Sequence, residues 1–167
     1  MNSTLYEHGI DADSSDYRVH VCFGEGMVYL YSTAAMRELL LTNPYRIYES
    51  PTSRAYIVPV ASVPECQSVP IPNRWLENLS TKVSKSSPTS TKRMWSEMLV
   101  RRMFERGHLT LLPTATMETS RAKQLAGHDI RIQLDCTVQV KCDWDGGANG
   151  SGNLYIETAE CNPNHEH

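Results

Sequence analysis

Hydrophobic and polar residues form short, β-prone patterns in the first third of the chain. The runs at 17–23 and 27–31 are rich in valine and tyrosine and are separated by a Gly-Glu-Gly turn signal at 24–26, so we expect a β-hairpin. Residues 33–42 combine leucine, alanine and methionine and stop before an Asn-Pro pair, which predicts a short helix. Another apolar run, at 55–61, predicts a further strand.

A longer helical pattern begins in the second half of the chain. Residues 91–106 carry their large apolar side chains at helical spacing, and Gly107 is a suitable residue to end the helix. This pattern predicts an amphipathic helix followed by a β-rich segment. Four later runs have the composition of strands: 109–113, 129–134, 137–142 and 154–158.

The segment between these two patterns predicts a division of the chain. Residues 80–93 are rich in serine, threonine and lysine, a composition typical of linkers and mobile loops. We expect this basic linker to separate a small N-terminal αβ unit, residues 1–79, from a second α/β unit, residues 94–167. The first unit shows no catalytic constellation, and we expect it to pack on the second unit or to mediate dimerisation.

Composition narrows the class of protein. No apolar run approaches the ~20 residues of a transmembrane helix, so we expect no membrane association. The N-terminus lacks the basic and apolar regions of a secretory signal. The five cysteines are scattered, without a CxxC pair, which argues against a disulfide scaffold and the common zinc frameworks. We therefore expect a soluble protein of a reducing cytoplasm.

The net charge of −3 hides an uneven distribution of charge. Residues 80–128 carry nine basic and three acidic side chains, whereas residues 129–167 carry two basic and seven acidic ones. Cations hold phosphates, and carboxylates hold metal ions. The pattern thus suits a metal enzyme that acts on a polyanion.

The candidate catalytic residues lie on two neighbouring predicted strands. Asp129 starts one of them, and Gln139 and Lys141 lie on the next. Residues two apart on a strand share a face, so the amide and the ammonium point together, and Asp129 can reach that face across the pair. A carboxylate, a second oxygen ligand and a lysine suit metal-assisted hydrolysis of a phosphodiester.

The order of these residues resembles the PD-(D/E)XK nuclease superfamily, which carries an acid on one strand and acid-X-Lys on the next. In the branch with archaeal Holliday junction resolvases and RecB-type nucleases, a glutamate on the preceding helix also points at the metal. Glu97, ten positions before Gly107, matches that glutamate. The runs VKCDW and GNLYIE are also similar to small phage-encoded nuclease-like proteins. The resemblance covers roughly residues 90–160.

The resemblance implies a restriction-endonuclease-like core, made of a helix and a mixed sheet of about four strands. It implies hydrolysis of DNA by a homodimer with Mg²⁺ or Mn²⁺ as cofactor. The metal ligands would be Glu97, Asp129 and the side-chain oxygen of Gln139, with the backbone carbonyl of Val140 as a further ligand. Lys141 would orient the attacking water.

One departure from the family pattern leaves two functions open. The first member of acid-X-Lys is Gln139, whose amide oxygen can bind a hard cation but adds no negative charge. The protein is then either an endonuclease or a nuclease-fold binding protein, weak or inactive in catalysis, that holds nucleic acid or blocks a protein partner. Glu157, on the last predicted strand, is either an extra acid or a solvent-facing one.

Basic residues near the predicted helix are candidates for DNA contact. They could follow a phosphate backbone, or they could only make a solubilising helix face. Glu97 has a similar structural alternative, an ion pair with Arg101 four residues later. The candidate nucleic-acid contacts are Lys92, Arg93, Arg101, Arg102, Arg106 and Lys123.

Overall fold

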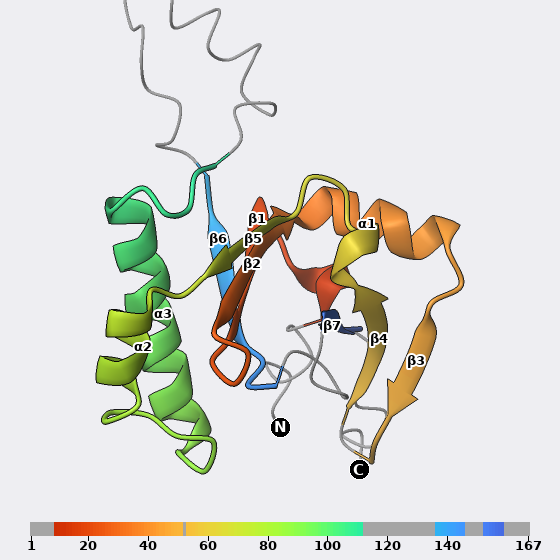
Figure 1. The fold of residues 1–167 in the computed structure, drawn as a ribbon. Helices are drawn as coiled ribbons and strands as arrows, with labels where there is room; N and C mark the ends of the chain where they lie inside the picture. Colours follow the sequence, from red (N-terminus) through yellow and green to blue (C-terminus); the bar gives the residue numbers. More distant parts are fainter. Residues whose placement is uncertain (1–8, 52, 112–135, 146–151, 159–167) are drawn as a thin grey trace, which may run out of the picture.

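The protein has a mixed α/β fold with two sheets and three α-helices in the part of the chain that the structure describes (Figure 1). This computed structural model describes residues 9–51, 53–111, 136–145 and 152–158. The helices are α1 (Thr33–Thr42), α2 (Asn73–Leu79) and α3 (Thr89–Glu105), and two short 3-10 turns span Ile10–Ala12 and Val60–Ser62.

The larger sheet is mixed and has the strand order β5-β2-β1-β6. Its first two strands form the expected antiparallel hairpin, and β6 joins parallel to β1. The smaller sheet is antiparallel, with the order β3-β4-β7. The strands are β1 (Tyr17–Cys22), β2 (Met27–Ser32), β3 (Arg46–Glu49), β4 (Arg54–Pro59), β5 (Gln67–Pro70), β6 (Val138–Cys142) and β7 (Asn153–Glu157).

Two glycines explain the tight connection between β1 and β2. Gly26 has a φ of +67°, a conformation that side chains rarely adopt. Gly24 donates a backbone hydrogen bond of 2.7 Å to the carbonyl of Trp144, and a Cβ at this glycine would lie 2.7 Å from the same oxygen. The turn therefore touches the segment that follows β6, and only glycine permits that approach.

The larger sheet is covered on both faces, as Figure 1 shows. On one face, valines and leucines of the sheet pack against Leu99, Val100 and Met103 of α3. On the other face, Tyr29 and Tyr31 pack against α1 and the smaller sheet. The result is a layered arrangement in which a sheet separates two hydrophobic cores.

Both sheets cross the boundary that the sequence predicts at residues 80–93. β6 pairs with β1, and β7 pairs with β4, so strands from the last quarter of the chain complete sheets that begin near its start. The segment 80–93 itself is also structured, because Val83 is buried in the core and α3 begins at Thr89. The structure thus differs from two units joined by a linker, because neither sheet is built from one half of the chain.

No α-helix among the described residues combines the length and the apolar character needed to cross a lipid bilayer. The longest, α3, has 17 residues and carries several charged side chains.

Candidate functional site

Strand β6 presents two different faces to the rest of the fold. Val138 and Val140 pack toward the core beneath α3. Gln139 and Lys141 alternate with these valines, so they point to the opposite face of the sheet. The parallel register places Gln139 beside Arg18 and Lys141 beside His20 on β1. The prediction that Gln139 and Lys141 share a face is confirmed.

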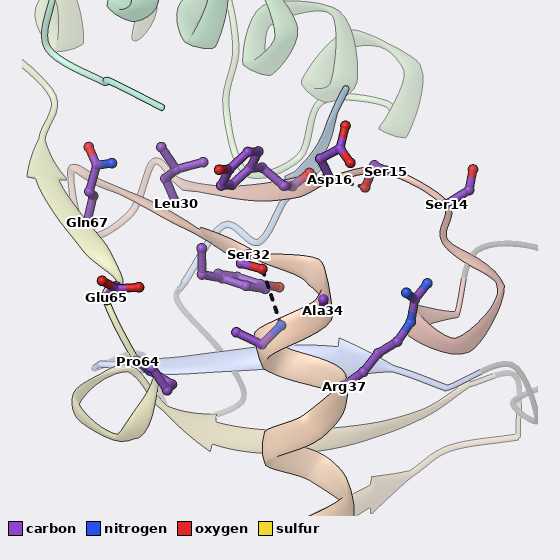
Figure 2. A pocket seen from close by; sticks show the side chains of 13 residues that line it. Ser14, Ser15, Asp16, Leu30, Ser32, Ala34, Arg37, Pro64, Glu65 and Gln67 are labelled. Atoms are coloured by element: carbon purple, nitrogen blue, oxygen red, sulfur yellow. Dashed lines mark hydrogen bonds between the residues drawn. The ribbon is translucent and has the colours of Figure 1, made fainter. Parts of the chain in front are cut away.

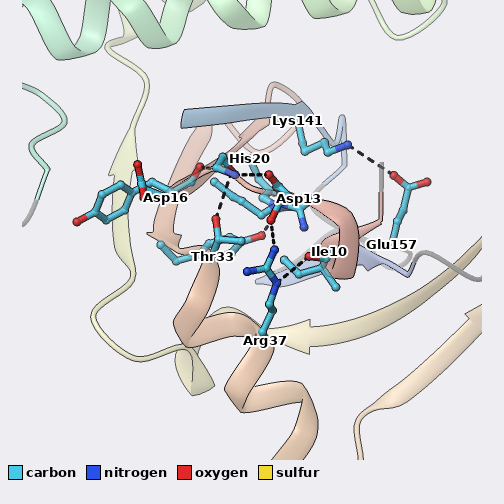
Figure 3. A network of polar contacts seen from close by, with 12 residues as sticks. Ile10, Asp13, Asp16, His20, Thr33, Arg37, Lys141 and Glu157 are labelled. Carbon is cyan, nitrogen blue, oxygen red and sulfur yellow. Dashed lines mark hydrogen bonds and ion pairs between the residues drawn. The ribbon is translucent and has the colours of Figure 1, made fainter. Parts of the chain in front are cut away.

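Lys141 faces a carboxylate from the other sheet (Figure 3). Its Nζ lies 4.0 Å from Oε1 of Glu157 on β7, and the two side chains are 20% and 40% exposed. Burial lowers the pKa of Lys141, and Arg18 lowers it further, whereas Glu157 and Asp13 act in the opposite direction. The ammonium therefore sits among both positive and negative neighbours, in a partly desolvated place.

Arg18 forms the buried centre of this polar region. Its side chain is 1% exposed, and Nε lies 3.3 Å from Oδ2 of Asp13. The guanidinium Nη1 has no hydrogen-bond partner in the described part of the chain. Asp13 is held in turn by Arg37, which donates to the backbone carbonyls of Ile10 and Asp13 (Figure 3). A charged group buried this deeply depends on its counterion.

His20 adds a neutral buried group to the same face. Its Nε2 lies 2.7 Å from the hydroxyl of Tyr31, and its Nδ1 has no partner among the described residues. Burial lowers the pKa of His20 well below its ordinary value of 6.5, and the cations Arg18 and Lys141 lower it further. Burial also raises the pKa of Tyr31, so both partners of this hydrogen bond stay uncharged near neutral pH.

The buried histidine makes stability depend on acid. Below pH 6.5 the unfolded chain takes up a proton at this position, whereas the folded protein does not, so stability falls with falling pH. Each unit of pKa difference between the two states is worth about 1.36 kcal/mol. We expect His20→Gln to show a smaller loss of unfolding free energy between pH 7.5 and pH 5 than the unaltered protein, measured by urea denaturation.

His108→Gln is the matched control, because His108 is exposed. This variant gives the baseline for removing a histidine from the surface. Equal pH slopes for the His20 variant and the unaltered protein would contradict a buried, neutral His20.

Glu97 lies apart from this face. It sits on α3, is 56% exposed, and its Oε2 lies 3.9 Å from Nε of Arg93 four residues earlier. The helix covers the valine face of β6, whereas Gln139 and Lys141 point to the other face. The structure therefore does not bring the predicted helix acid to the predicted strand residues. The helix ion pair expected as its alternative forms with Arg93 rather than with Arg101.

Two predicted site residues, Asp129 and Lys123, lie outside the described residues, as do the predicted strand at 129–134 and the last two residues of that at 109–113. The described residues of the latter, 109–111, form no strand, so that prediction is wrong there. The remaining candidate DNA contacts all lie on or next to α3. Lys92 stands 5.7 Å from the ring centre of Trp144. Arg101 and Arg102 line a groove between α2 and α3. Arg106 is exposed at the end of α3.

A hollow of about 340 Å³ lies at the start of α1 (Figure 2). Several of its polar side chains already form hydrogen bonds within the fold. Ser32 Oγ accepts from the backbone N–H of Ala35 and caps the helix. Asp16 accepts from the backbone N–H and the hydroxyl of Thr137, and Arg37 binds backbone carbonyls. This hollow therefore offers little unused chemistry.

Comparisons with known protein families, with curated proteins and with solved structures find no match for this chain. Function must therefore be inferred from the residues and their geometry.

The described residues do not by themselves form a metal site. Within the described ranges, no group of three acidic, histidine or cysteine side chains is arranged to hold a metal ion. The candidate face does supply the carboxylate of Glu157 and the amide oxygen of Gln139. These are oxygen ligands of the kind that Mg²⁺ takes, commonly with only one or two carboxylates and several waters.

Proposed function

We propose that the protein is a divalent-metal-dependent DNA endonuclease and that Gln139, Lys141 and Glu157 form part of its site. One observation carries the proposal: a partly buried lysine faces a carboxylate at 4.0 Å and shares a strand face with an amide oxygen two residues away. The lysine and the amide are those that the sequence motif singles out. Glu157 takes the place of Glu97 as the second acid.

The proposed roles follow from the chemistry of each group. Glu157, Gln139 and the predicted acid Asp129 would hold Mg²⁺ or Mn²⁺, with the backbone carbonyl of Val140 as a further ligand. The metal would supply Lewis-acid stabilisation of charge on the phosphate. Lys141 would orient the attacking water and balance negative charge as the phosphodiester bond breaks. Partial burial strengthens this electrostatic effect, because less water surrounds the ammonium.

The proposal includes a restriction-endonuclease-like core. In the described part of the larger sheet, β6 is an edge strand. The proposed core also includes the strand that the sequence predicts at 129–134, which lies outside the described residues. The proposed enzyme acts as a homodimer, as resolvase-like nucleases do.

Cleavage assays with plasmid and branched DNA test this function. With Mg²⁺ or Mn²⁺ we expect cleavage by the unaltered protein and its loss in Lys141→Ala, in Asp129→Ala and in Glu157→Gln. Glu97→Gln is the matched control, because Glu97 lies on the exposed side of α3 and pairs with Arg93. Loss of cleavage in this control would instead indicate that Glu97, the helix acid, takes part in catalysis.

A second function is favoured by one observation. Gln139 brings no charge, so Glu157 is the one carboxylate among the described residues that forms an ion pair with Lys141. If DNA stays intact with every metal and every DNA form, the endonuclease proposal is wrong. The chain is then best explained as a nuclease-fold binding protein that holds nucleic acid or blocks a protein partner.

A further inference from the structure

A groove of about 500 Å³ runs between α2 and α3. Figure 1 shows both helices on one side of the larger sheet, and Lys141 points to the other side. Leu79 and Leu99 line its apolar part, and Trp75 and Trp95 stand one on each helix. The size lies within the range of small-molecule sites, between about 300 and 1,000 Å³. The catalytic proposal makes no use of this groove.

The two tryptophan side chains pack against the protein but remain accessible to solvent. Both pack against the core beneath α3, and both remain partly exposed. The rings of Trp75 and His108 also lie nearly perpendicular, with ring centres 5.1 Å apart and an angle of 84° between the planes. Rings fixed in this way offer apolar surface to a flat ligand at little cost in conformational entropy.

Positive charge surrounds the same groove. Lys82, Arg101 and Arg102 line it, against the single carboxylate of Glu105. In the described ranges, none of the three cations takes part in an ion pair. Trp95, Met98 and Arg102 follow at three- and four-residue intervals, so helix geometry puts an indole and a guanidinium on one face. The groove therefore combines aromatic surface with unneutralised cations.

We propose that this groove binds a single-stranded segment of nucleic acid. Unpaired bases can stack on indole rings, and the backbone phosphates then meet the three cations. A duplex keeps its bases stacked inside and would use only the cations. An acidic peptide would likewise leave the tryptophans without flat partners. This inference does not depend on the proposed cleavage, because the groove lies on the other face of the sheet and binding needs no metal.

Binding is measured with the full chain and a fluorescein-labelled oligothymidine of about 12 nucleotides, in EDTA so that no cleavage occurs. Fluorescence anisotropy gives the affinity, and quenching of tryptophan emission gives a second readout that needs no variant. We expect Trp95→Leu to weaken binding about tenfold and Trp95→Phe to retain most of it, since stacking of one base contributes about 1–3 kcal/mol.

The cations are tested separately by their salt dependence. Arg101→Gln with Arg102→Gln should weaken binding and flatten the plot of log affinity against log salt, because fewer counterions are released. Arg74→Gln is the matched control, because Arg74 is an exposed arginine on α2 that does not line the groove. These surface changes leave the core unchanged, and thermal melts check that every variant is folded.

Three results would overturn the inference. One is equal affinity for the oligonucleotide, a duplex of the same length and heparin, which would indicate a purely electrostatic surface. Another is unaltered tryptophan emission at saturating oligonucleotide. The third is an unchanged affinity in a folded Trp95→Leu protein. A protein that cleaves no DNA but passes these tests would contradict the proposed function and leave this inference standing.

Discussion

Asp13→Asn should lower the free energy of unfolding by about 3–5 kcal/mol, measured by urea denaturation near neutral pH. Arg18 is 1% exposed, and the carboxylate of Asp13 lies 3.3 Å from its Nε. Asparagine keeps the shape and the amide oxygen but removes the negative charge. The guanidinium would then stay buried among Lys141 and His20 without a counterion, which is the costly way to break a buried pair.

Two further variants separate the cost of leaving a buried charge unpaired from the cost of losing any ion pair. Glu97→Gln breaks an exposed pair on α3 and should change stability by no more than about 0.5 kcal/mol. Combining Asp13→Asn with Arg18→Met should recover most of the lost stability, because no unpaired charge remains inside. If Asp13→Asn lowers the free energy of unfolding no more than Glu97→Gln does, Arg18 must be more accessible to water than the structure shows.

Ile156→Ala should cost about 2–5 kcal/mol of unfolding free energy, in the range for large-to-small changes in a core. Ile156 lies on β7, is fully buried, and packs in the core that contains Tyr31 and Met36. The deleted side-chain atoms leave a cavity between the two sheets. The change therefore measures how strongly the last described strand is bound to elements from the first third of the chain.

Ile47→Ala is the matched control, because Ile47 is 40% exposed on the edge strand β3. We expect it to cost less than about 1 kcal/mol, because little apolar area leaves water at this position on folding. Equal costs for the two isoleucines would show that β7 is not packed as described. A single cooperative transition in both variants would agree with sheets that join the two halves of the chain.

The local parts of the fold could be predicted from the sequence. The hairpin has alternating apolar residues and a glycine turn, and α1 spans Thr33–Thr42 as its cap and stop signals indicate. The helix expected at 91–106 appears as α3, two residues longer at its start. These elements carry their signals within a few neighbouring residues, so no knowledge of their partners is needed.

The pairing of distant strands could not be predicted. Alternation shows that one side of β1 is apolar, but it does not show what covers the other side. Arg18 and His20 alternate with valines and look like residues of a solvent face, yet both are 1% exposed because α1 and the smaller sheet cover them. Helix α2 and the short strands β3 and β5 were also missed, since these segments are brief or contain prolines.

The candidate site could be predicted only where its residues lie close together in the sequence. Gln139 and Lys141 share a face by simple strand alternation, which needs only local sequence. Glu97 was placed by analogy of spacing, and the structure instead puts it on the far side of the larger sheet. The sequence alone does not single out Glu157 as a site residue, because only the packing of the two sheets brings it toward Lys141.

The parallel pairing of β1 with β6 has a consequence for synthesis on the ribosome. Just before these strands, Asp16 accepts a hydrogen bond from the backbone of Thr137, 121 residues later in the chain. Contacts of such long range are slow to form, because a large loop must close first. One edge of β1 thus stays unpaired until the residues of β6 have emerged from the ribosome. The nascent chain therefore carries an aggregation-prone strand edge that becomes shielded only after β6 has been synthesised.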